Sequence, residues 1–361
     1  MSFVICIKTI SFLYIYKKIF IINNMYYHSK EFDKNEVILK EVDSSERYVL
    51  FPIKYNDLFR MYKKQASVYW VADEINFAED LKHLDKLSKD EKYFVNHILA
   101  FFAGSDGIVM ENLGTRFLAD VNIPEAKCFY SFQIAIEAVH SETYSLLIDT
   151  YCKDEKEKHD LFKAIETFPA IKVKADWALK WIGNEECSFA QRLVAFAIIE
   201  GVFFSASFCA IFWLKERGLL PGLSFANQLI SRDESLHTEF ACMLYQYLDN
   251  KVPENIVYEM FDEAVNIEDQ FINESIKCSM IGMNSNLMKD YIMYIGDRVL
   301  VMLGYNKKYM KENPFHFMEY SAVDGKTNFF DAKVAEYQIG SINIESGKSA
   351  IPDKIEVSED F

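Results

Sequence analysis

Basic residues are in short supply along this chain. Lysine and arginine number 39, against 54 aspartate and glutamate residues, which gives a formal net charge of −15 at pH 7. A surface of this sign repels phosphate backbones, and no cluster of basic residues is large enough to form a nucleic-acid footprint. We therefore expect no nucleic-acid partner.

Paired cysteines are also missing. The seven cysteines are odd in number and scattered, and none forms a Cys-x-x-Cys motif, which is typical of reduced thiols in an intracellular protein. They are Cys6, Cys128, Cys152, Cys187, Cys209, Cys242 and Cys278. The pattern predicts a cytoplasmic protein.

The apolar N-terminal segment lacks the features of a membrane anchor. Lys8, Lys17 and Lys18 interrupt it, so no apolar run reaches the roughly 20 residues that a span needs, and no small-residue cleavage site follows. We interpret residues 1–45 as an N-terminal extension that is disordered or precedes the natural start, with Met25 as the candidate start. A targeting role for residues 1–24 is the alternative.

One internal run does have the length of a membrane span. The stretch from Leu193 to Leu214 holds a single carboxylate, Glu200, near its middle. A central helix of a soluble bundle is also apolar all round, and the helices expected before and after this run are polar. We therefore predict a core helix rather than a membrane helix.

Strand patterns are sparse, and helix signals dominate. Ser88 and Glu91 have the spacing of a capping box, which predicts a helix that continues to about Ala119. Pro124 is expected to open the next helix. Similar signals recur along the chain, so we predict an all-α bundle. From Gly340 onward the sequence is polar and acidic without periodicity, which indicates a flexible tail.

Two of the histidines follow a glutamate by three residues, in EAVH at 137–140 and in ESLH at 234–237. Positions three apart share one face of a helix, so Glu137 and His140 point the same way, as do Glu234 and His237. One such pair on a surface helix is common by chance and is more often a solvated pair than a ligand pair. Two such pairs on apolar helices are a stronger signal.

Each of these motifs is preceded by a helix with one carboxylate on an apolar face. Asp106 stands 31 residues before Glu137, and Glu200 stands 34 residues before Glu234. Two antiparallel helices of about twenty residues bring mid-helix positions level roughly thirty residues apart, so each carboxylate is expected to face its partner. Four buried carboxylates would repel one another unless cations lie among them.

Two divalent metal ions would balance the four carboxylates, and two neutral imidazoles would add ligands without charge. Two single carboxylates with two Glu-x-x-His motifs are the ligand arrangement of ferritin-like di-iron and di-manganese proteins. We therefore predict a ferritin-like helical bundle with a di-metal carboxylate site. Core histidines satisfied by nearby acids are the alternative. The predicted ligands are Asp106, Glu137, His140, Glu200, Glu234 and His237.

Tyr144 lies one helical turn beyond His140, on the side of the predicted metals. A tyrosine in a core is ordinarily a large apolar body with a hydrogen-bonded tip. Here Phe204, Phe208 and Ile230 lie on the ligand-bearing helices, where they would form an apolar pocket. A phenol beside an oxygen-activating di-iron centre is oxidisable to a phenoxyl radical, and a dry lining would protect that radical from quenching.

From about Tyr48 to Phe361 the chain resembles the small, radical-generating subunit of class I ribonucleotide reductase of the eukaryotic type. The motifs that carry the resemblance include YKKQASVYW, SDGIVMENL, CFYSFQIAIEAVHSETYSLLIDTY, LISRDESLH and GKTNFF. The resemblance implies the activity of a ribonucleoside-diphosphate reductase, which supplies deoxyribonucleotides for DNA synthesis. It implies two oxo-bridged iron ions per chain, activated by O2, and a stable radical on Tyr144.

The resemblance also implies a path for radical transfer. Trp70 and Asp233 would lead to the ligand His140, and Tyr337 would relay to a large subunit that holds the substrate. The protein would act only together with that subunit.

The same resemblance implies partners and domain limits. We expect a homodimer, a ferritin-like di-iron domain at residues 46–337, and a flexible tail at 338–361. The last residues, Ile355 to Phe361, would dock on the large subunit.

Two residues depart from the family pattern. Ser235 stands where the family usually has glycine, so its side chain is expected to crowd the site, and Asn76 stands where an acid is common. The ligands, Tyr144, Trp70 and Tyr337 are all present, which favours a competent subunit. A radical-less regulatory paralogue and another ferritin-like di-iron oxidase are the alternatives. The choice between iron and manganese stays open.

Overall fold

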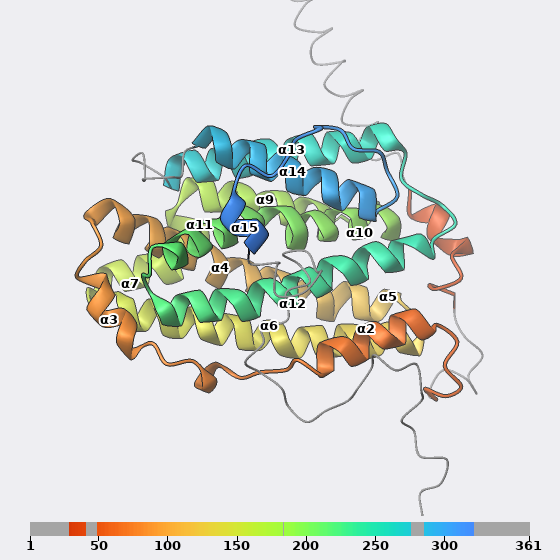
Figure 1. Ribbon diagram of the computed structural model, residues 1–361. Coiled ribbons are helices and arrows are strands. Elements are labelled where there is room, and N and C mark those ends of the chain that lie inside the picture. Colours follow the sequence, from red (N-terminus) through yellow and green to blue (C-terminus); the bar gives the residue numbers. More distant parts are fainter. Residues whose placement is uncertain (1–28, 41–48, 183, 276–284, 321–361) are drawn as a thin grey trace, which may run out of the picture.

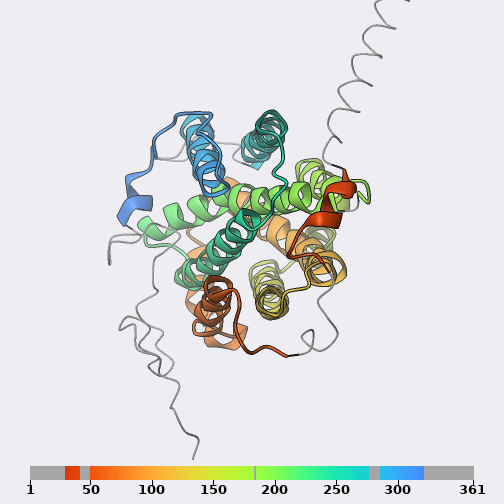
Figure 2. The same cartoon turned by 90° about the vertical axis from the view of Figure 1, so that its right-hand side faces the viewer.

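The computed structural model describes residues 29–40, 49–182, 184–275 and 285–320, and these ranges are dominated by helices (Figure 1). Within them the only β-type contact is an isolated antiparallel bridge between Ser29 and Cys187. The long helices lie side by side, and Figure 2 views several of them along their axes. The prediction of an all-α bundle is confirmed.

The helices of the first half of the sequence follow one another with short connections. They are η1 (Lys30–Asn35), α2 (Asn56–Ala66), η2 (Ala72–Glu74), α3 (Ala78–Leu84), α4 (Lys89–Asn112), η3 (Leu113–Phe117), α5 (Leu118–Asp120), α6 (Pro124–Tyr151), α7 (Glu155–Phe162) and α8 (Ala164–Thr167).

The second half repeats this pattern. Its helices are α9 (Pro169–Ile182), α10 (Phe189–Ile198), η4 (Ile199–Phe203), α11 (Ser205–Glu216), α12 (Pro221–Gln246), α13 (Glu254–Ser275), α14 (Ser285–Met302) and α15 (His316–Tyr320).

Local sequence signals set several of the helix boundaries. At the start of α4 the Ser88 hydroxyl accepts the Glu91 N–H at 3.2 Å, and the Glu91 carboxylate accepts the Ser88 N–H at 2.8 Å. This is the expected capping box, which satisfies two backbone donors at a helix start. Pro124 stands at the first position of α6, as expected.

Two of the long helices are widened by a π-helical turn, which no pattern in the sequence predicts. The turn η3 connects α4 to α5, and the turn η4 connects α10 to α11. A π-helical turn takes in one more residue per hydrogen-bonded ring than an α-helix and often marks a functional site. The second turn is of interest because it carries Glu200.

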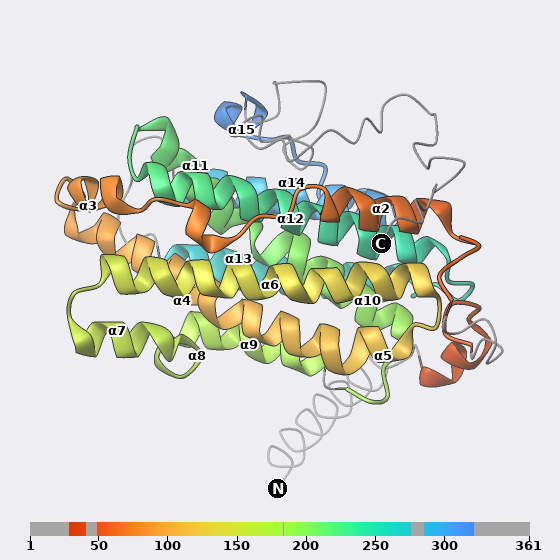
Figure 3. The same cartoon turned by 90° about the horizontal axis from the view of Figure 1, so that it is seen from below.

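Contacts between the long helices enclose the interior of the bundle. Helix α6 packs against α4 and α2, and helix α12 packs against α10 and α11 (Figure 3). The core between them is continuous and rich in aromatic side chains. The predicted carboxylate ligands belong to α4, α6, η4 and α12, and these four segments therefore line one shared interior.

Among the described residues, two stretches are long and apolar enough to cross a membrane by length and composition, Lys89–Asp120 and Phe189–Glu216. Their most apolar windows are 56% and 100% buried inside the bundle, respectively. Neighbouring helices cover the second stretch, which accounts for its apolar character. The interpretation of Leu193 to Leu214 as a core helix is confirmed.

Residues 29–40, which fall within the predicted N-terminal extension, pack against the bundle. The Asp33 carboxylate accepts the Phe189 N–H at the start of α10, at 2.9 and 3.0 Å. Ile38 is buried. Residues 1–28, Tyr337 and the predicted tail at 338–361 lie outside the described residues.

Candidate metal centre

The six predicted ligands come from four segments of the bundle and all are buried. Helix α4 provides Asp106, and the turn η4 provides Glu200, while α6 and α12 provide the two Glu-x-x-His motifs. None is more than 2% exposed. The ligands are Asp106, Glu137, His140, Glu200, Glu234 and His237.

Two overlapping groups of side chains have the spacing of metal sites. Within each group the candidate ligand atoms lie within 4.8 Å of one another. We call them the Asp106 position, formed by Asp106, Glu137 and His140, and the Glu200 position, formed by Glu137, Glu200, Glu234 and His237. Glu137 belongs to both groups, so the two positions are adjacent.

Glu137 and Glu234 lie between the two histidines and direct one oxygen at each. From Glu137, Oε2 lies 3.5 Å from His140 Nδ1 and Oε1 lies 3.0 Å from His237 Nδ1. From Glu234, Oε1 lies 3.0 Å from His140 Nδ1 and Oε2 lies 3.0 Å from His237 Nδ1. Both glutamates are therefore placed to bridge two ions, with one histidine at each end.

The electrostatics of the metal-free cluster are those of a proton-holding site. Burial raises the pKa of Asp106 and of Glu200 well above the usual range, and nearby glutamates add to the rise. Burial alone would lower the pKa of His140 and of His237, but the surrounding carboxylates raise it well above the ordinary value. Metal ions would replace these protons, because metal ligands bind in their deprotonated forms.

Several polar atoms of the cluster lack a hydrogen-bond partner. Asp106 Oδ2, Glu137 Oε2 and Glu200 Oε2 are buried without one among the described residues. Buried polar groups are almost always satisfied, so these oxygens point to a missing binding partner. A donor set of carboxylates and imidazoles suits iron or manganese, and two cations would balance the four carboxylates. The residues fit a di-metal centre.

The outer ring nitrogen of His140 faces a carboxylate that also accepts a hydrogen bond from Trp70. His140 Nε2 lies 3.3 Å from Asp233 Oδ2, and the Trp70 indole donates to the same oxygen at 2.7 Å. Trp70 and His140 are also stacked, with ring centroids 5.9 Å apart. The structure thus brings together Trp70, Asp233 and His140.

Two further residues near the histidines, which contact Asp233 and His237, were not predicted from the sequence. Arg232 donates to Asp233 Oδ1 from both Nε and Nη2, at 3.1 and 2.9 Å. The Gln65 side-chain amide lies 2.9 Å from His237 Nε2. Gln65 belongs to the same YKKQASVYW motif as Trp70, and this shared motif is the signal that was available for it. Such partners orient metal-bound histidines.

Tyr144 lies in an aromatic pocket beside the cluster. It is 1% exposed, and its hydroxyl has no hydrogen-bond partner among the described residues. Burial raises its pKa well above the ordinary value, with the charge of Asp106 as the next cause, so the phenol keeps its proton.

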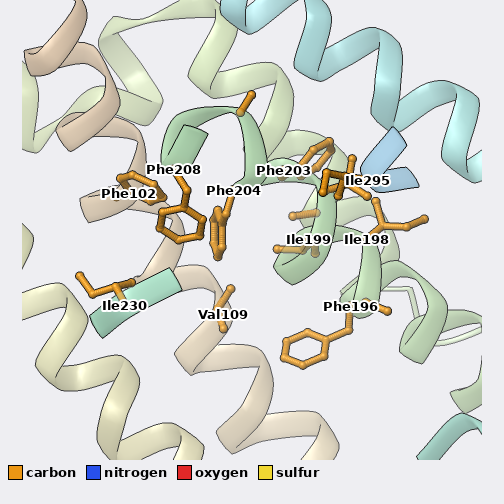
Figure 4. Close-up of a cluster of buried hydrophobic side chains, with 14 of the residues drawn as sticks. Phe102, Val109, Phe196, Ile198, Ile199, Phe203, Phe204, Phe208, Ile230 and Ile295 are labelled. Atoms are coloured by element: carbon orange, nitrogen blue, oxygen red, sulfur yellow. The ribbon is translucent and has the colours of Figure 1, made fainter. Parts of the chain in front are cut away.

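Phe102, Phe204, Phe208 and Ile230 gather in one part of the core (Figure 4). Phe102 was missed, although it precedes Asp106 by four residues and so shares the ligand face of its helix. Its ring packs between Tyr144 and Phe208, with centroids 4.6 and 5.0 Å away.

Ser235 and Asn76, which depart from the family pattern, each form a hydrogen bond to a nearby backbone group. The Ser235 hydroxyl donates to the Ser231 carbonyl one turn back, at 2.6 Å, so its polar end is engaged with its own helix. The Asn76 side-chain oxygen accepts the N–H of Ala78 at 2.9 Å at the start of α3.

A helical bundle whose core holds single carboxylates and two Glu-x-x-His motifs defines the ferritin-like carboxylate di-metal class. The protein belongs to one family of this class, because residues 47–314 match the family model described as "Ribonucleotide reductase, small chain".

Curated relatives agree with this assignment. Over 305 residues the sequence is 54% identical to ribonucleoside-diphosphate reductase subunit M2 of Danio rerio and 53% identical to that of Homo sapiens, covering 84% of this protein and 78% of each relative. Over 322 residues it is 53% identical to the ribonucleoside-diphosphate reductase small chain of Neurospora crassa, covering 89% of this protein and 78% of that one.

Solved structures show the same fold. The ribonucleotide reductase Rnr4 homodimer from Saccharomyces cerevisiae matches with a TM-score of 0.76 and 35% identity, covering 84% of this protein and 96% of that one. The dimanganese(II)-NrdF of Streptococcus sanguinis matches with a TM-score of 0.63 at 18% identity, covering 75% and 94%, which shows the fold alone.

Proposed function

We propose that this protein is the small subunit of a ribonucleoside-diphosphate reductase, and that it holds two iron ions and generates a radical on Tyr144. The subunit assignment rests on family membership and on more than half identity to curated small chains over most of the sequence. A small chain of this enzyme acts with a large-subunit partner. The iron, the radical and the roles of single residues are the proposed part.

The proposed ligands divide between the two metal positions. Asp106 and His140 would hold one ion, Glu200 and His237 would hold the other, and Glu137 and Glu234 would each offer one oxygen to either ion. This division follows the pairing of each glutamate oxygen with a different histidine. When bound, two iron ions together with O2 supply the one-electron oxidation of a nearby phenol.

The residues around Tyr144 suit a long-lived radical. The phenol is protonated before oxidation, because burial and the neighbouring carboxylates raise its pKa. The rings of Phe102, Phe204 and Phe208 form a hydrocarbon lining that offers no hydrogen to a radical and keeps water out. The observation that carries the proposal is this buried phenol, whose hydroxyl has no hydrogen-bond partner among the described residues, beside a cluster in which Glu137 and Glu234 each face both histidines.

Radical transfer is proposed to run through the series of contacts from His140 to Asp233 to Trp70. Asp233 Oδ2 accepts from Trp70 Nε1 and faces His140 Nε2, while Arg232 holds the other carboxylate oxygen. Burial alone would raise the pKa of Asp233, but Arg232 and His140 lower it, so the carboxylate stays an acceptor. Tyr337 would continue the path to the large subunit.

The remaining partners and the location are also proposals. Ile355 to Phe361 would order on the large subunit, with the terminal acids meeting basic residues there. A homodimer is proposed by analogy with the yeast relative. The described cysteines are free, which agrees with a reducing cytoplasm as the proposed location.

Reconstitution of the metal-free protein tests the function directly. After addition of Fe(II) and O2, low-temperature EPR should show a tyrosyl signal, and metal analysis should give close to two irons per protein molecule. Tyr144→Phe is the matched control, because it should keep the metals and lose the signal. Metal binding without a signal in the wild type would favour a radical-less paralogue or another oxidase. Absence of metal binding would overturn the assignment of the centre.

A further inference from the structure

The π-helical turn η4 carries Glu200 between α10 and α11. A single π-helical turn loosens the regular backbone ladder and adds one residue to it. All five residues of η4 are buried, so a carbonyl that leaves the ladder has no water to bind and needs a donor from the protein. The turn therefore depends on groups outside its own backbone.

Two side chains supply donors at the C-terminal end of η4. The Ser205 hydroxyl donates to the Val202 carbonyl at 2.7 Å, and the Lys174 ammonium group donates to the Phe203 carbonyl at 2.7 Å. Ser205 lies two residues after the end of the turn, whereas Lys174 belongs to α9. Lys174 thus ties the turn to a separate helix of the bundle.

Lys174 is a buried charge in aromatic surroundings. Its side chain is 2% exposed, and its Nζ lies 2.6 Å from Oε2 of the fully buried Glu268 on α13. The same atom lies 3.4 Å from the ring centroid of Phe101 and 4.2 Å from that of Phe271. Three helices and the turn therefore meet at one ammonium group.

An ion pair is a costly way to fill this space. Two charges lose their hydration on burial, and well-packed apolar residues of similar volume often give equal or greater stability. An apolar pair would lack a donor for the Phe203 carbonyl. A return of the turn to α-helical geometry would then give the unpaired carbonyl a backbone partner. This change would rotate Glu200 relative to α11 by about 100°, the angle per residue of an α-helix.

We propose that Lys174 and Glu268 are positioning residues for the metal ligand Glu200. The ammonium group, held by the Glu268 carboxylate, pins the Phe203 carbonyl and keeps η4 in the geometry that directs Glu200 into the cluster. This inference rests on the proposed function, because it takes Glu200 as a ligand. It deepens that proposal by assigning the support of one metal position to a charge pair outside the cluster.

The consequence is an unequal effect on the two metal positions. The Glu200 position depends on the turn, whereas the ligands of the Asp106 position come from α4, α6 and α12, none of which includes the turn. Removal of the pair should therefore weaken the Glu200 position and leave the Asp106 position close to its normal affinity. A residue that merely stabilises the fold would affect both positions alike.

The test uses the full-length protein with Co(II) alone as the probe. Lys174→Met with Glu268→Leu replaces the pair by apolar side chains of similar size. Anaerobic titration followed by calorimetry and visible absorption should show two tight sites in the wild type. In the double variant one site should remain tight, and the other should lose about tenfold to 100-fold in affinity, as is usual for loss of a supporting partner.

Two matched variants separate the donor from the helix packing. Glu268→Gln keeps the Lys174 donor and should hold both sites within about threefold of wild type, a small part of the usual supporting-partner effect. Glu263→Gln changes another contact between α9 and α13, where the Glu263 carboxylate accepts from the Trp177 indole at 2.9 Å. It should leave both sites unchanged.

The outcomes distinguish this inference from the proposed function. Two unaltered sites in the double variant, or equal weakening of both, would overturn the positioning role. Failure of the wild type to bind two ions would instead overturn the di-metal assignment. If the double variant does not fold, Lys174→Met with Glu268→Gln is judged by the same criterion. Failure of that variant to fold would assign the pair to general stability and also count against the proposal.

Discussion

Tyr144 and Phe102 are stacked almost parallel, with ring centroids 4.6 Å apart and 7° between the ring planes. The two residues come from different helices, α6 and α4, whose contact also brings Asp106 and the first Glu-x-x-His motif together. The proposed radical site and the Asp106 position are therefore parts of one helix pair. A change in the packing of this pair reaches both.

Phe102→Leu tests the lining of the proposed radical. The variant should load metal normally, because no ligand changes, and should lose about 1–3 kcal/mol of unfolding free energy from the altered core packing. The tyrosyl EPR signal should decay several-fold faster than in the wild type, because the stacked ring no longer covers the phenol. Phe117→Leu, at a buried ring elsewhere in the core, is the control. Equal decay in both variants would contradict a specific lining role.

Glu234→Ala tests the shared ligands. Because Glu234 directs one oxygen at each histidine, its loss should impair both metal positions rather than one. Metal analysis after reconstitution should fall well below two ions per protein molecule, while circular dichroism should still report the helical fold. Glu239→Ala removes a half-buried carboxylate, paired with Lys64, from the same helix and serves as the control. Normal loading of Glu234→Ala would rule out the ligand assignment.

Trp70→Phe tests the proposed transfer path. It removes the indole N–H that donates to Asp233 Oδ2 and leaves the metal ligands in place. The Tyr144 signal should form after reconstitution, but turnover with the large subunit should be lost. The free energy of unfolding should fall by about 1–3 kcal/mol, because a buried acceptor loses a partner. Activity close to that of the wild type would show that radical transfer does not use Trp70.

The buried pair of Lys174 and Glu268 predicts a pH dependence for the stability of the metal-free protein. Burial raises the pKa of Glu268 to about 7 from 4.5, so its contribution to stability falls as the pH rises from about 4.5 to about 7. Burial lowers the pKa of Lys174 to about 8 from 10.5, so its contribution rises between about pH 8 and 10.5. The pair should therefore cost most stability between about pH 7 and 8.

Denaturant unfolding of wild type and of Lys174→Met/Glu268→Leu over this range measures the effect. The double variant lacks both titrating groups, so its stability relative to wild type should be greatest between about pH 7 and 8 and should shrink on either side. A difference in unfolding free energy that does not change with pH would contradict the buried, ionised pair.

Deletion of Ile355 to Phe361 tests the docking segment. These residues lie outside the described residues, and the prediction rests on their sequence, which ends in two acids and a phenylalanine. The truncated protein should keep its metals and the Tyr144 signal, but it should lose binding to the large subunit and reductase activity. A synthetic peptide of these seven residues should compete with the intact protein. Normal binding by the truncated protein at ordinary concentrations would refute the docking role.

Local patterns in the sequence predicted the parts of the site that depend on one helix. The spacing of Glu137 and His140 places both on one face of α6, and the capping box at Ser88 and Glu91 sets the start of α4. Such features follow from helix geometry alone, which is fixed by 3.6 residues per turn. The interval from Asp106 to Glu137 likewise predicted that two antiparallel helices would bring their carboxylates level.

Some pairings between distant segments were not available from the sequence. Nothing local links Lys174 to Glu268, or Gln65 to His237, because each contact depends on how several helices pack around a common core. Phe102 was missed for the same reason, since its stacking on Tyr144 requires the particular crossing of α4 and α6.

The sequence by itself determined the helices, the ligand types and the faces on which they lie, because helical periodicity and capping act over a few residues. Only the tertiary structure decided which glutamates lie between the two histidines, and where the turn η4 departs from α-helical geometry. The physical reason is that the contacts of a shared glutamate, and the hydrogen bond from Lys174 to the Phe203 carbonyl, come from side chains of separate helices. Their free energy therefore belongs to the packed bundle and to no single segment of the sequence.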